Sequence, residues 1–402
     1  MKYIILSDPH LGMNFPFLLD SIGISTRARD FYVVFDKVKD LIIEFHSRQE
    51  KVIVIIAGDF YHKINIIPAF RAITYEFLKS LAVQVIILGG NHDTTKNIDN
   101  PCSLDDLLLI PGVSVKRNIE SSIIGDIGFV FLPFIRPFYI ADLLVKKLGK
   151  TIDKDNIQNL AYIELTRKIS KEIEKIKDCK KRIAITHYMI KGMNAKADEL
   201  DDGGFVLPLE LFLSFDHVFA GHIHSPHEFS NVVVLGSTEY TRISEIGEKK
   251  RFIIYDDSND TIESVELKPR KHVIINFEYK GEDSLVFNKK IQDEAKQIGI
   301  KNAVVRFQIH CKGEERAFVN GNFDYNAYPD AFYVHTIELK EEGSEIEKNV
   351  ELNLFDLSFK GNLDSYAATF IDKAFHREFL EKGNQIIASV LKDESINQKE
   401  DE

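Results

Sequence analysis

The nine residues VIILGGNHD, at positions 85–93, decide what kind of fold this chain adopts. Four consecutive apolar residues have the length and composition of a buried strand. The two glycines that follow allow the chain to turn sharply where the strand ends. Asn91, His92 and Asp93 are therefore delivered together at the C-terminal end of a strand. In open α/β sheets, ligands bind at that edge.

Two earlier apolar runs have the same form. Residues 2–6 and 52–56 are short and apolar, and each is followed by polar residues and a glycine. Residues 29–46 carry apolar side chains at helical spacing, and residues 68–81 are a second expected helix that starts at Pro68. Strands and helices that alternate at this spacing predict parallel βαβ units. Further along we expect a hairpin at 123–132, a helix at 156–177, strands at 182–186, 217–220, 232–235 and 251–255, and a short helix at 209–215.

The pattern changes at the sequence KPR, residues 268–270. We therefore predict a first domain over 1–265 and a small α+β domain over 268–342. The elements of this second domain are expected to be strands at 272–279, 303–310 and 332–339 and a helix at 284–298. Residues 343–402 begin as a charged linker. Residues 365–391 have the apolar spacing of an amphipathic helix, or of a helix pair broken near Gly383, which either binds a partner or packs on the preceding α+β domain.

The composition indicates a soluble, cytoplasmic protein, associated with the nucleoid if the host is a prokaryote. Hydrophobic residues make up 44% of the chain, and no apolar run approaches the roughly 20 residues that a membrane helix needs. The three cysteines, Cys102, Cys179 and Cys311, are scattered and favour a reducing compartment. No signal peptide precedes the first strand.

The net charge of −11 argues at first against a nucleic-acid substrate. Residues 341–402 alone hold 15 acidic and 7 basic residues, a net charge of −8, so the preceding 340 residues carry only −3. DNA is therefore allowed as a substrate, although no overall basic charge indicates it.

Five strand ends in the first 225 residues finish in residue types that bind metals. These residues are Asp8, His10, Asp59, Asn91, His187, His222 and His224. Neighbouring strands of a parallel sheet lie about 4.8 Å apart, so the loops at their ends can converge on one site. Two carboxylates, four imidazoles and one amide are too many for one tetrahedral ion, and they suit two divalent metals bridged by Asp59. Such a pair activates water for attack on a phosphate ester.

Each of these motifs has a structural explanation when taken singly. Asparagine and aspartate favour turns because they bond to nearby backbone groups. The occurrence of all the motifs in this order, each at the end of an apolar strand, favours a metal centre over a set of ordinary turns.

The residues around Asn91 have separate expected tasks. If Asn91 faces the metals, then His92 points elsewhere, and we assign it the catalytic role of protonating the leaving oxygen or stabilising charge on the phosphate. Asp93 is expected to orient the His92 ring. His62 is expected to lie behind the ligands or to face the substrate, and a polar loop residue is the structural alternative.

This order of motifs resembles the calcineurin-like metallophosphoesterases. More closely, it is similar to the nuclease subunits of double-strand-break repair complexes, which are SbcD in bacteria and the meiotic recombination eleven nuclease in archaea and eukaryotes. The similarity rests on the domain order and on the stretches DPHLG at 8–12, GDFYH at 58–62 and LGSTE at 235–239.

The resemblance implies an α/β fold, in which a calcineurin-like β-sandwich flanked by helices precedes an α+β DNA-capping domain. A C-terminal helical segment would bind an SbcC-type ATPase, an SMC-like protein with a coiled coil. A homodimer would form through helices near 67–81 and 100–110, and His62 would help to position DNA. The resemblance also implies two Mn²⁺ ions per subunit, one held by Asp8, His10, Asp59 and His224 and the other by Asp59, Asn91, His187 and His222.

The expected function is manganese-dependent exonuclease and endonuclease cleavage at DNA ends by a two-metal mechanism. A small-molecule or nucleotide phosphoesterase on the same scaffold is the main alternative, and a non-catalytic DNA-tethering subunit is a second. One departure from the family pattern is the charged stretch KKRF at 249–252, which we interpret as a phosphate contact.

Overall fold

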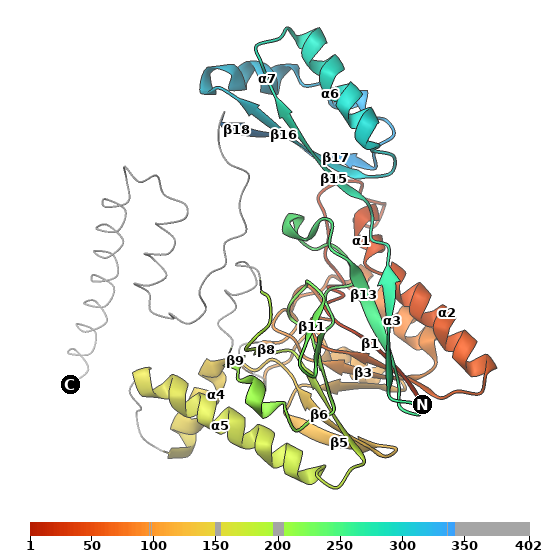
Figure 1. The fold of residues 1–402 in the computed structure, drawn as a ribbon, viewed down its shortest axis with the longest axis vertical. Coiled ribbons are helices and arrows are strands. Elements are labelled where there is room, and N and C mark those ends of the chain that lie inside the picture. The colour runs from red at the N-terminus through yellow and green to blue at the C-terminus, as the bar shows by residue number, and fades with distance from the viewer. Residues whose placement is uncertain (96, 98, 149–153, 196–204, 336, 342–402) are drawn as a thin grey trace. The chain divides into compact units, whose positions relative to one another are not determined.

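The strands that carry the candidate ligands lie in two facing six-stranded sheets (Figure 1). The computed structural model describes residues 1–95, 97, 99–148, 154–195, 205–335 and 337–341, all within one compact unit. The first sheet has the strand order β14-β13-β1-β2-β3-β4, and the second has the order β11-β12-β10-β7-β6-β5. The predicted class, an α/β fold with a β-sandwich flanked by helices, is confirmed.

Parallel strands form the centre of the first sheet. Its members are β1 (Lys2–Leu6), β2 (Val52–Ile56), β3 (Gln84–Leu88), β4 (Val113–Lys116), β13 (Lys250–Asp256) and β14 (Thr261–Leu267). Strands β1 to β4 are parallel, whereas β13 and β14 continue the sheet as antiparallel strands. Strand β14 was not predicted, because an edge strand with mostly exposed side chains has little apolar pattern to detect.

The second sheet also has a parallel centre with antiparallel edges. Its members are β5 (Glu120–Ile124), β6 (Ile127–Leu132), β7 (Lys181–Thr186), β10 (His217–Ala220), β11 (His227–Phe229) and β12 (Val232–Val234). Strands β5 and β6 confirm the predicted hairpin.

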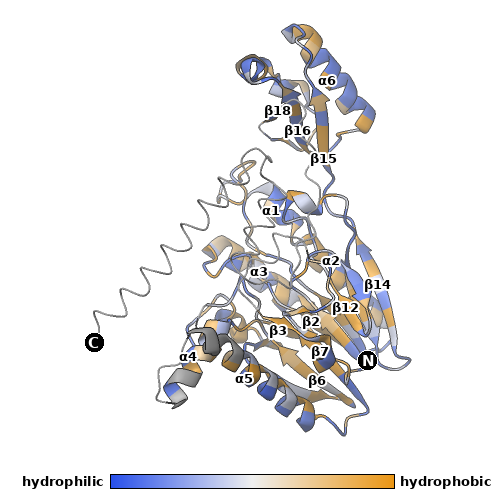
Figure 2. Ribbon diagram, turned by 60° about the vertical axis from the view of Figure 1, so that its left-hand side comes forward, coloured by the Kyte–Doolittle hydropathy of each residue, from blue (hydrophilic) through white to orange (hydrophobic). Residues whose placement is uncertain are grey.

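Alternate side chains of the same strands fill two different cores, because successive residues of a strand point to opposite faces. Tyr3 and Ile5 of β1 pack between the two sheets against residues such as Phe129. Ile4 and Leu6 pack on the other face, under the helices. Figure 2 shows the hydrophobic colouring of strands β2, β3, β6 and β7 at the centre of this sandwich.

Helices cover the outer faces of the two sheets. They are α1 (Thr26–Asp30), α2 (Val33–Ser47), α3 (Pro68–Leu81), the 3₁₀ helix η1 (Asp105–Leu109), α4 (Pro137–Leu148) and α5 (Lys154–Lys175). The single helix predicted at 29–46 is two helices, and α1 begins early because the Ser25 side chain accepts a hydrogen bond from the Arg27 backbone N–H. The segment after α5 packs tightly on the second sheet, since a Cβ added to Gly128 of β6 would lie 2.6 Å from Cβ of Ile176.

A smaller α/β domain, which we call the cap domain, covers residues 272–341. Its elements are β15 (His272–Glu278), α6 (Ser284–Ile298), β16 (Val304–Cys311), α7 (Arg316–Asn322), β17 (Tyr333–Val334) and β18 (Glu338–Glu341). Strand β16 pairs with β15 on one side and with both β17 and β18 on the other. The strand predicted at 332–339 is therefore two short strands. The domain has its own buried core, which includes Phe287, Ile291 and Phe307.

The remaining described elements are short. They are β8 (Met189–Ile190), β9 (Val206–Leu207) and the 3₁₀ turns η3 (Leu209–Leu211), η4 (Ile243–Glu245), η5 (Gly313–Glu315) and η6 (Tyr325–Ala327). The helix predicted at 209–215 is thus a single turn. Among the helices in the described ranges, none is long and apolar enough to cross a bilayer. The predicted C-terminal segment, 343–402, lies outside the described residues.

Candidate metal centre

All seven predicted ligands come together where five parallel strands end. Asp8 and His10 follow β1, Asp59 follows β2, Asn91 follows β3, His187 follows β7, and His222 and His224 follow β10. Each of these residues is at most 7% exposed. Buried polar groups in such number require partners, because an unpaired buried charge is costly.

One group of ligand atoms is formed by Asp8, His10 and His224. The Nε2 atoms of the two histidines lie 3.1 Å apart. Nε2 of His224 lies 3.8 Å from Oδ1 of Asp8, and Nε2 of His10 lies 3.8 Å from Oδ2 of Asp59. These contacts define the first subsite.

A second group is formed by Asp8, Asp59 and His187. Nε2 of His187 lies 3.4 Å from Oδ2 of Asp59 and 3.8 Å from Oδ1 of Asp8. The Asn91 side-chain oxygen lies 3.1 Å from Nε2 of His187 and 3.1 Å from Nδ1 of His222. Asp59 therefore lies between the two groups, as expected for a bridging ligand, and Asp8 also reaches both.

The backbone is strained at four of these ligands. Asp8, His10, Asp59 and His222 have positive φ angles of 50°, 44°, 46° and 76°. Non-glycine residues adopt this left-handed conformation at a cost of about 1–3 kcal/mol each, and such strain clusters at functional sites. The strand ends thus use tight, unfavourable turns to aim these side chains inward.

The glycines next to the ligands are needed for close approach. Gly89 and Gly90 were expected to allow a sharp turn, but neither is among the described glycines with positive φ. Instead, a Cβ added to Gly90 would lie 2.0 Å from Oδ1 of Asp59, and one added to Gly58 would lie 2.0 Å from Nδ1 of His187. Any side chain at either position would displace a ligand.

The donor set fits divalent cations. Oδ1 of Asp8 is buried without a hydrogen-bond partner although two histidine nitrogens lie nearby. Burial lowers the pKa of His10 well below its usual value and that of His222 to about 3. Both rings are therefore neutral, the form in which imidazole binds metals. Burial also disfavours the charged form of His187, but Asp59 and Asp8 outweigh it and raise its pKa to about 10, which shows how strongly the carboxylates attract positive charge.

His92 lies at the edge of this centre, and its side chain is 29% exposed. Its Nδ1 lies 3.0 Å from the backbone carbonyl of His62, so Nδ1 carries the proton and Nε2 points the other way. Nε2 lies 4.0 Å from Oδ2 of Asp59. The His62 ring stacks beside that of His92, with centroids 5.4 Å apart, and its Nδ1 lies 3.4 Å from Nδ1 of His10. The His62 ring therefore lies against both the His92 and the His10 rings.

A sequence model of the calcineurin-like phosphoesterase family matches residues 1–226, more than half of the chain. The chain belongs to the calcineurin-like phosphoesterase family. Membership makes it a hydrolytic enzyme that acts on phosphoester bonds and binds divalent metals. A comparison with curated protein sequences finds no match.

Several solved structures resemble this phosphoesterase over part of its length. An archaeal phosphodiesterase is 14% identical, with 66% of this chain and 100% of that chain covered and a TM-score of 0.30. A 5′-nucleotidase precursor from Thermus thermophilus is 12% identical, with 66% and 54% covered and a TM-score of 0.35. The sulfate thiohydrolase SoxB, also from Thermus thermophilus, is 10% identical, with 66% and 56% covered and a TM-score of 0.33. The phosphoesterase thus spans about half the length of the last two.

The Asp93 carboxylate does not contact the His92 ring, contrary to our prediction that it orients this ring. The carboxylate accepts hydrogen bonds from the backbone N–H groups of Gly90 at 2.8 Å, Phe60 at 2.7 Å and Tyr61 at 3.4 Å. The His62 carbonyl holds the His92 ring instead. Asp93 therefore ties the loop after β3 to the loop after β2, because carboxylates are strong acceptors for backbone amides.

Asp93→Ala is expected to destabilise the phosphoesterase by about 2–4 kcal/mol, because it leaves buried N–H groups unpaired. Denaturant unfolding followed by circular dichroism measures the loss. Asp126→Ala, which alters an exposed turn residue, is the control and should change stability by less than about 0.5 kcal/mol. An Asp93→Ala protein as stable as the control would show that these hydrogen bonds do not hold the loops.

We interpreted the charged stretch at 249–252 as a phosphate contact. Lys250, at its centre, cannot make such a contact. The Lys250 side chain is fully buried, and its ammonium group donates to Glu245 Oε2 at 2.7 Å and to Ser237 Oγ at 2.8 Å. Arg251 pairs with Glu228 at 3.0 Å. A lysine enclosed by its own acceptors has no donor left for a substrate.

Proposed function

We propose that this phosphoesterase is a manganese-dependent DNA nuclease with exonuclease and endonuclease activity, acting at DNA ends in a double-strand-break repair complex. The observation that carries the proposal is the combination of a paired ligand cluster with a separate domain attached beside it. The ligand cluster accounts for phosphodiester hydrolysis. The cap domain supplies a further surface that a nucleotide-sized substrate does not need.

In this proposal, two Mn²⁺ ions occupy the two subsites. Asp8, His10 and His224 would hold one, Asn91, His187 and His222 would hold the other, and Asp59 would serve both. When bound, such a pair activates water and neutralises charge on the phosphate. We assign His92 the role of acting on the phosphate itself; its Nδ1 faces the His62 carbonyl, so Nε2 points away from it, and its partly exposed side chain supports this assignment. It would donate a proton to the leaving oxygen or stabilise charge there.

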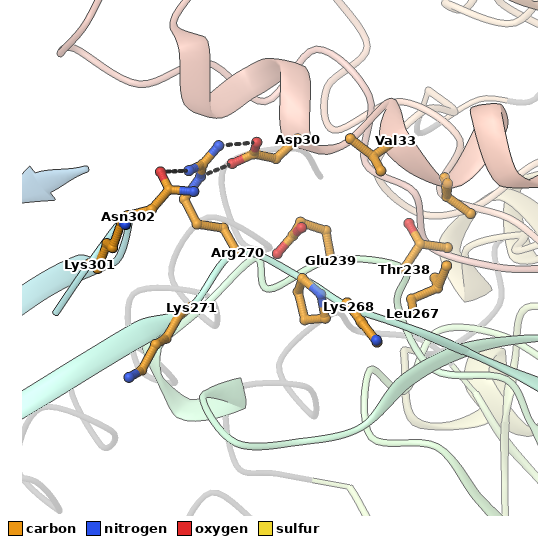
Figure 3. Close-up of a pocket in the computed structure, with 12 residues that line it drawn as sticks. Asp30, Val33, Thr238, Glu239, Leu267, Lys268, Arg270, Lys271, Lys301 and Asn302 are labelled. Atoms are coloured by element: carbon orange, nitrogen blue, oxygen red, sulfur yellow. Dashed lines mark hydrogen bonds and ion pairs between the residues drawn. The ribbon is translucent and has the colours of Figure 1, made fainter. Parts of the chain in front are cut away.

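The contacts of Arg270 support a functional link between the cap domain and helix α1, which follows the candidate ligands Asp8 and His10 in the chain. Nε and Nη2 of Arg270 donate to the two carboxylate oxygens of Asp30 at 2.6 and 2.7 Å, and its Nη1 donates to Oδ1 of Asn302 at 2.8 Å (Figure 3). Its guanidinium also lies 3.6 Å from the centroid of the Phe332 ring. Such bidentate pairs fix orientation as well as distance.

A second contact joins the cap domain to the loop after His10. The rings of Phe17 and Tyr333 are stacked with centroids 3.6 Å apart. A cavity of about 330 Å³ beside the Arg270–Asp30 pair is lined in part by Lys268, Lys271 and Lys301 (Figure 3). Lysines in such a position suit the phosphates of a polynucleotide.

The substrate is tested by comparing labelled duplex DNA with free nucleotides and a generic phosphodiester. The full chain is expected to degrade DNA in Mn²⁺, to lose this activity in EDTA, and to regain it when Mn²⁺ is restored. An SbcC-type ATPase with ATP is expected to raise the rate. Hydrolysis of nucleotides with intact DNA would overturn the nuclease proposal in favour of a small-molecule phosphoesterase. Metal binding without any hydrolysis would favour a tethering subunit.

The ATPase partner belongs to the same proposal. We infer that residues 343–402, which lie outside the described residues, dock on the coiled coil of an SbcC-type ATPase through the amphipathic pattern at 365–391. When the ATPase and ATP are added to the DNA hydrolysis assay described above, a chain that lacks residues 350–402 should show no increase in rate.

The proposed homodimer uses the segments near 67–81 and 100–110. These segments expose several large apolar side chains, and a contiguous patch of such side chains is typical of a protein–protein interface: Ile67 at 45%, Tyr75 at 37%, Leu108 at 54% and Leu109 at 76%. Leu109→Glu is expected to convert a dimer to a monomer in light scattering. Ile123→Glu, at a position 61% exposed on the edge strand β5, is the control and should leave the mass unchanged. A dimeric Leu109→Glu protein would place the interface elsewhere.

A further inference from the structure

A buried network of charged side chains lies behind His224, and Glu245 at its centre was not among the predicted site residues. Glu245 and Lys250 are 1% and 0% exposed. Oε1 of Glu245 lies 2.7 Å from Nδ1 of His224, and Oε2 accepts a hydrogen bond of 2.7 Å from the Lys250 ammonium group. Both residues follow β12, at η4 and at the start of β13.

The two nitrogens of the His224 ring face different partners. Nδ1 faces Glu245, whereas Nε2 faces Oδ1 of Asp8 at 3.8 Å and Nε2 of His10 at 3.1 Å. A carboxylate only accepts, so the proton is held on Nδ1. The lone pair of Nε2 is then directed to the side where the candidate ligands meet, which is how carboxylates behind metal-binding histidines act.

Lys250 has the task of keeping the Glu245 carboxylate paired. Its ammonium group donates to Ser237 Oγ at 2.8 Å and to the His224 carbonyl at 3.2 Å in addition to Glu245. Thr241 completes the enclosure by donating to Glu245 Oε1 at 2.6 Å. A carboxylate without such partners would be unstable in this dry position.

We infer that Glu245, held by Lys250, is a positioning residue that fixes the ring orientation and tautomer of His224 and thereby sets the affinity of one of the two metal subsites. The inference rests on the two-ion centre of the proposed function, but not on its substrate. It assigns the segment from Ser237 to Lys250 a role in metal binding that its position in the sequence does not reveal.

A manganese titration of the full chain without substrate tests this inference. Wild type is expected to bind two ions and to give the electron paramagnetic resonance signal of a coupled pair. Glu245→Ala should weaken one site about 10- to 100-fold and leave a single-ion signal at intermediate Mn²⁺. His224→Ala, as the reference, should lose the same ion. Glu245→Gln should recover part of the affinity, because its side-chain oxygen still accepts from Nδ1.

Glu239→Gln is the matched control. Glu239 lies in the same segment, is 5% exposed, and pairs with Arg27 at 3.1 Å, but it does not contact His224. This variant loses a buried ion pair and should still bind two ions with unchanged affinity. If it weakened manganese binding as much as Glu245→Ala, general destabilisation of the segment would explain both, and the inference would be overturned.

The remaining outcomes separate this inference from the proposed function. Unchanged manganese affinities in Glu245→Ala and Glu245→Gln would overturn the positioning role, whatever the substrate. Conversely, the manganese titrations of wild type and variants could follow the expected pattern while wild type leaves DNA intact. That result would support the positioning role and overturn the nuclease proposal. A wild-type chain that binds no Mn²⁺ would overturn both. Glu245→Gln keeps the shape of the side chain, so it serves if Glu245→Ala does not fold.

Discussion

Asp59→Ala is expected to lower metal-dependent phosphodiester hydrolysis by about 10³-fold or more. The Asp59 carboxylate lies within 4 Å of ring nitrogens of His10, His187 and His92, which places it between the two subsites. In the proposed two-ion centre, its loss would remove a ligand from both ions at once and leave the histidines with one carboxylate fewer to balance a divalent cation. Initial rates on labelled DNA in Mn²⁺ measure the effect.

The same variant separates metal binding from folding. Far-ultraviolet circular dichroism should remain native, because the strands around Asp59 are held by the apolar cores on both faces of the sheet. His187→Ala should show the same loss of activity. Asp178→Ala, at an exposed turn, should retain full activity. Full activity in either Asp59→Ala or His187→Ala would place the metal centre elsewhere.

His92→Ala is expected to retain both metals and to lose turnover by about 10²- to 10⁴-fold, the usual contribution of a general acid. The ring is partly exposed at the edge of the centre, and its Nδ1 faces the backbone carbonyl of His62. The loss should therefore fall on kcat, while the manganese titration stays at two ions per chain. Single-turnover kinetics on labelled DNA measure it.

A control variant and the metal content of His92→Ala are needed to interpret this result. His46→Ala, which removes an exposed histidine at the end of α2, should have wild-type kinetics and metal content. If His92→Ala bound fewer ions, His92 would be a ligand or a support for the ligands and not an acid acting on the phosphate.

Much of the sandwich could be predicted from the sequence, because its central strands are nearly continuous apolar runs. Apart from Lys2 and Gln84 at the first positions of β1 and β3, strands β1, β2 and β3 are buried on both faces, so these residues had to be apolar. The candidate ligands could be found for the same reason, since each polar residue stands out directly after such a run. Edge strand β14 and helix α7 lacked this contrast and were missed.

The roles of residues next to the ligands could not be read in the same way. Asp93 adjoins His92 in the chain, yet its carboxylate turns toward amides of the neighbouring loop. Lys250 looked like a surface cation, yet it is buried against Glu245. A carboxylate or an ammonium group has the same chemistry whether it faces a substrate or is buried in a structural hydrogen bond. Only its neighbours in the folded protein decide which of these roles it has.

The sequence by itself determined the βαβ order, the residue types at each strand end and the family to which they point, because these depend on local apolar patterns and on side-chain chemistry. The tertiary structure alone decided that Asp8 reaches both subsites, that the glycines serve close approach, and that Glu245 stands behind His224. These features depend on distances between segments as far apart as Asp8 and His224, which no local pattern encodes.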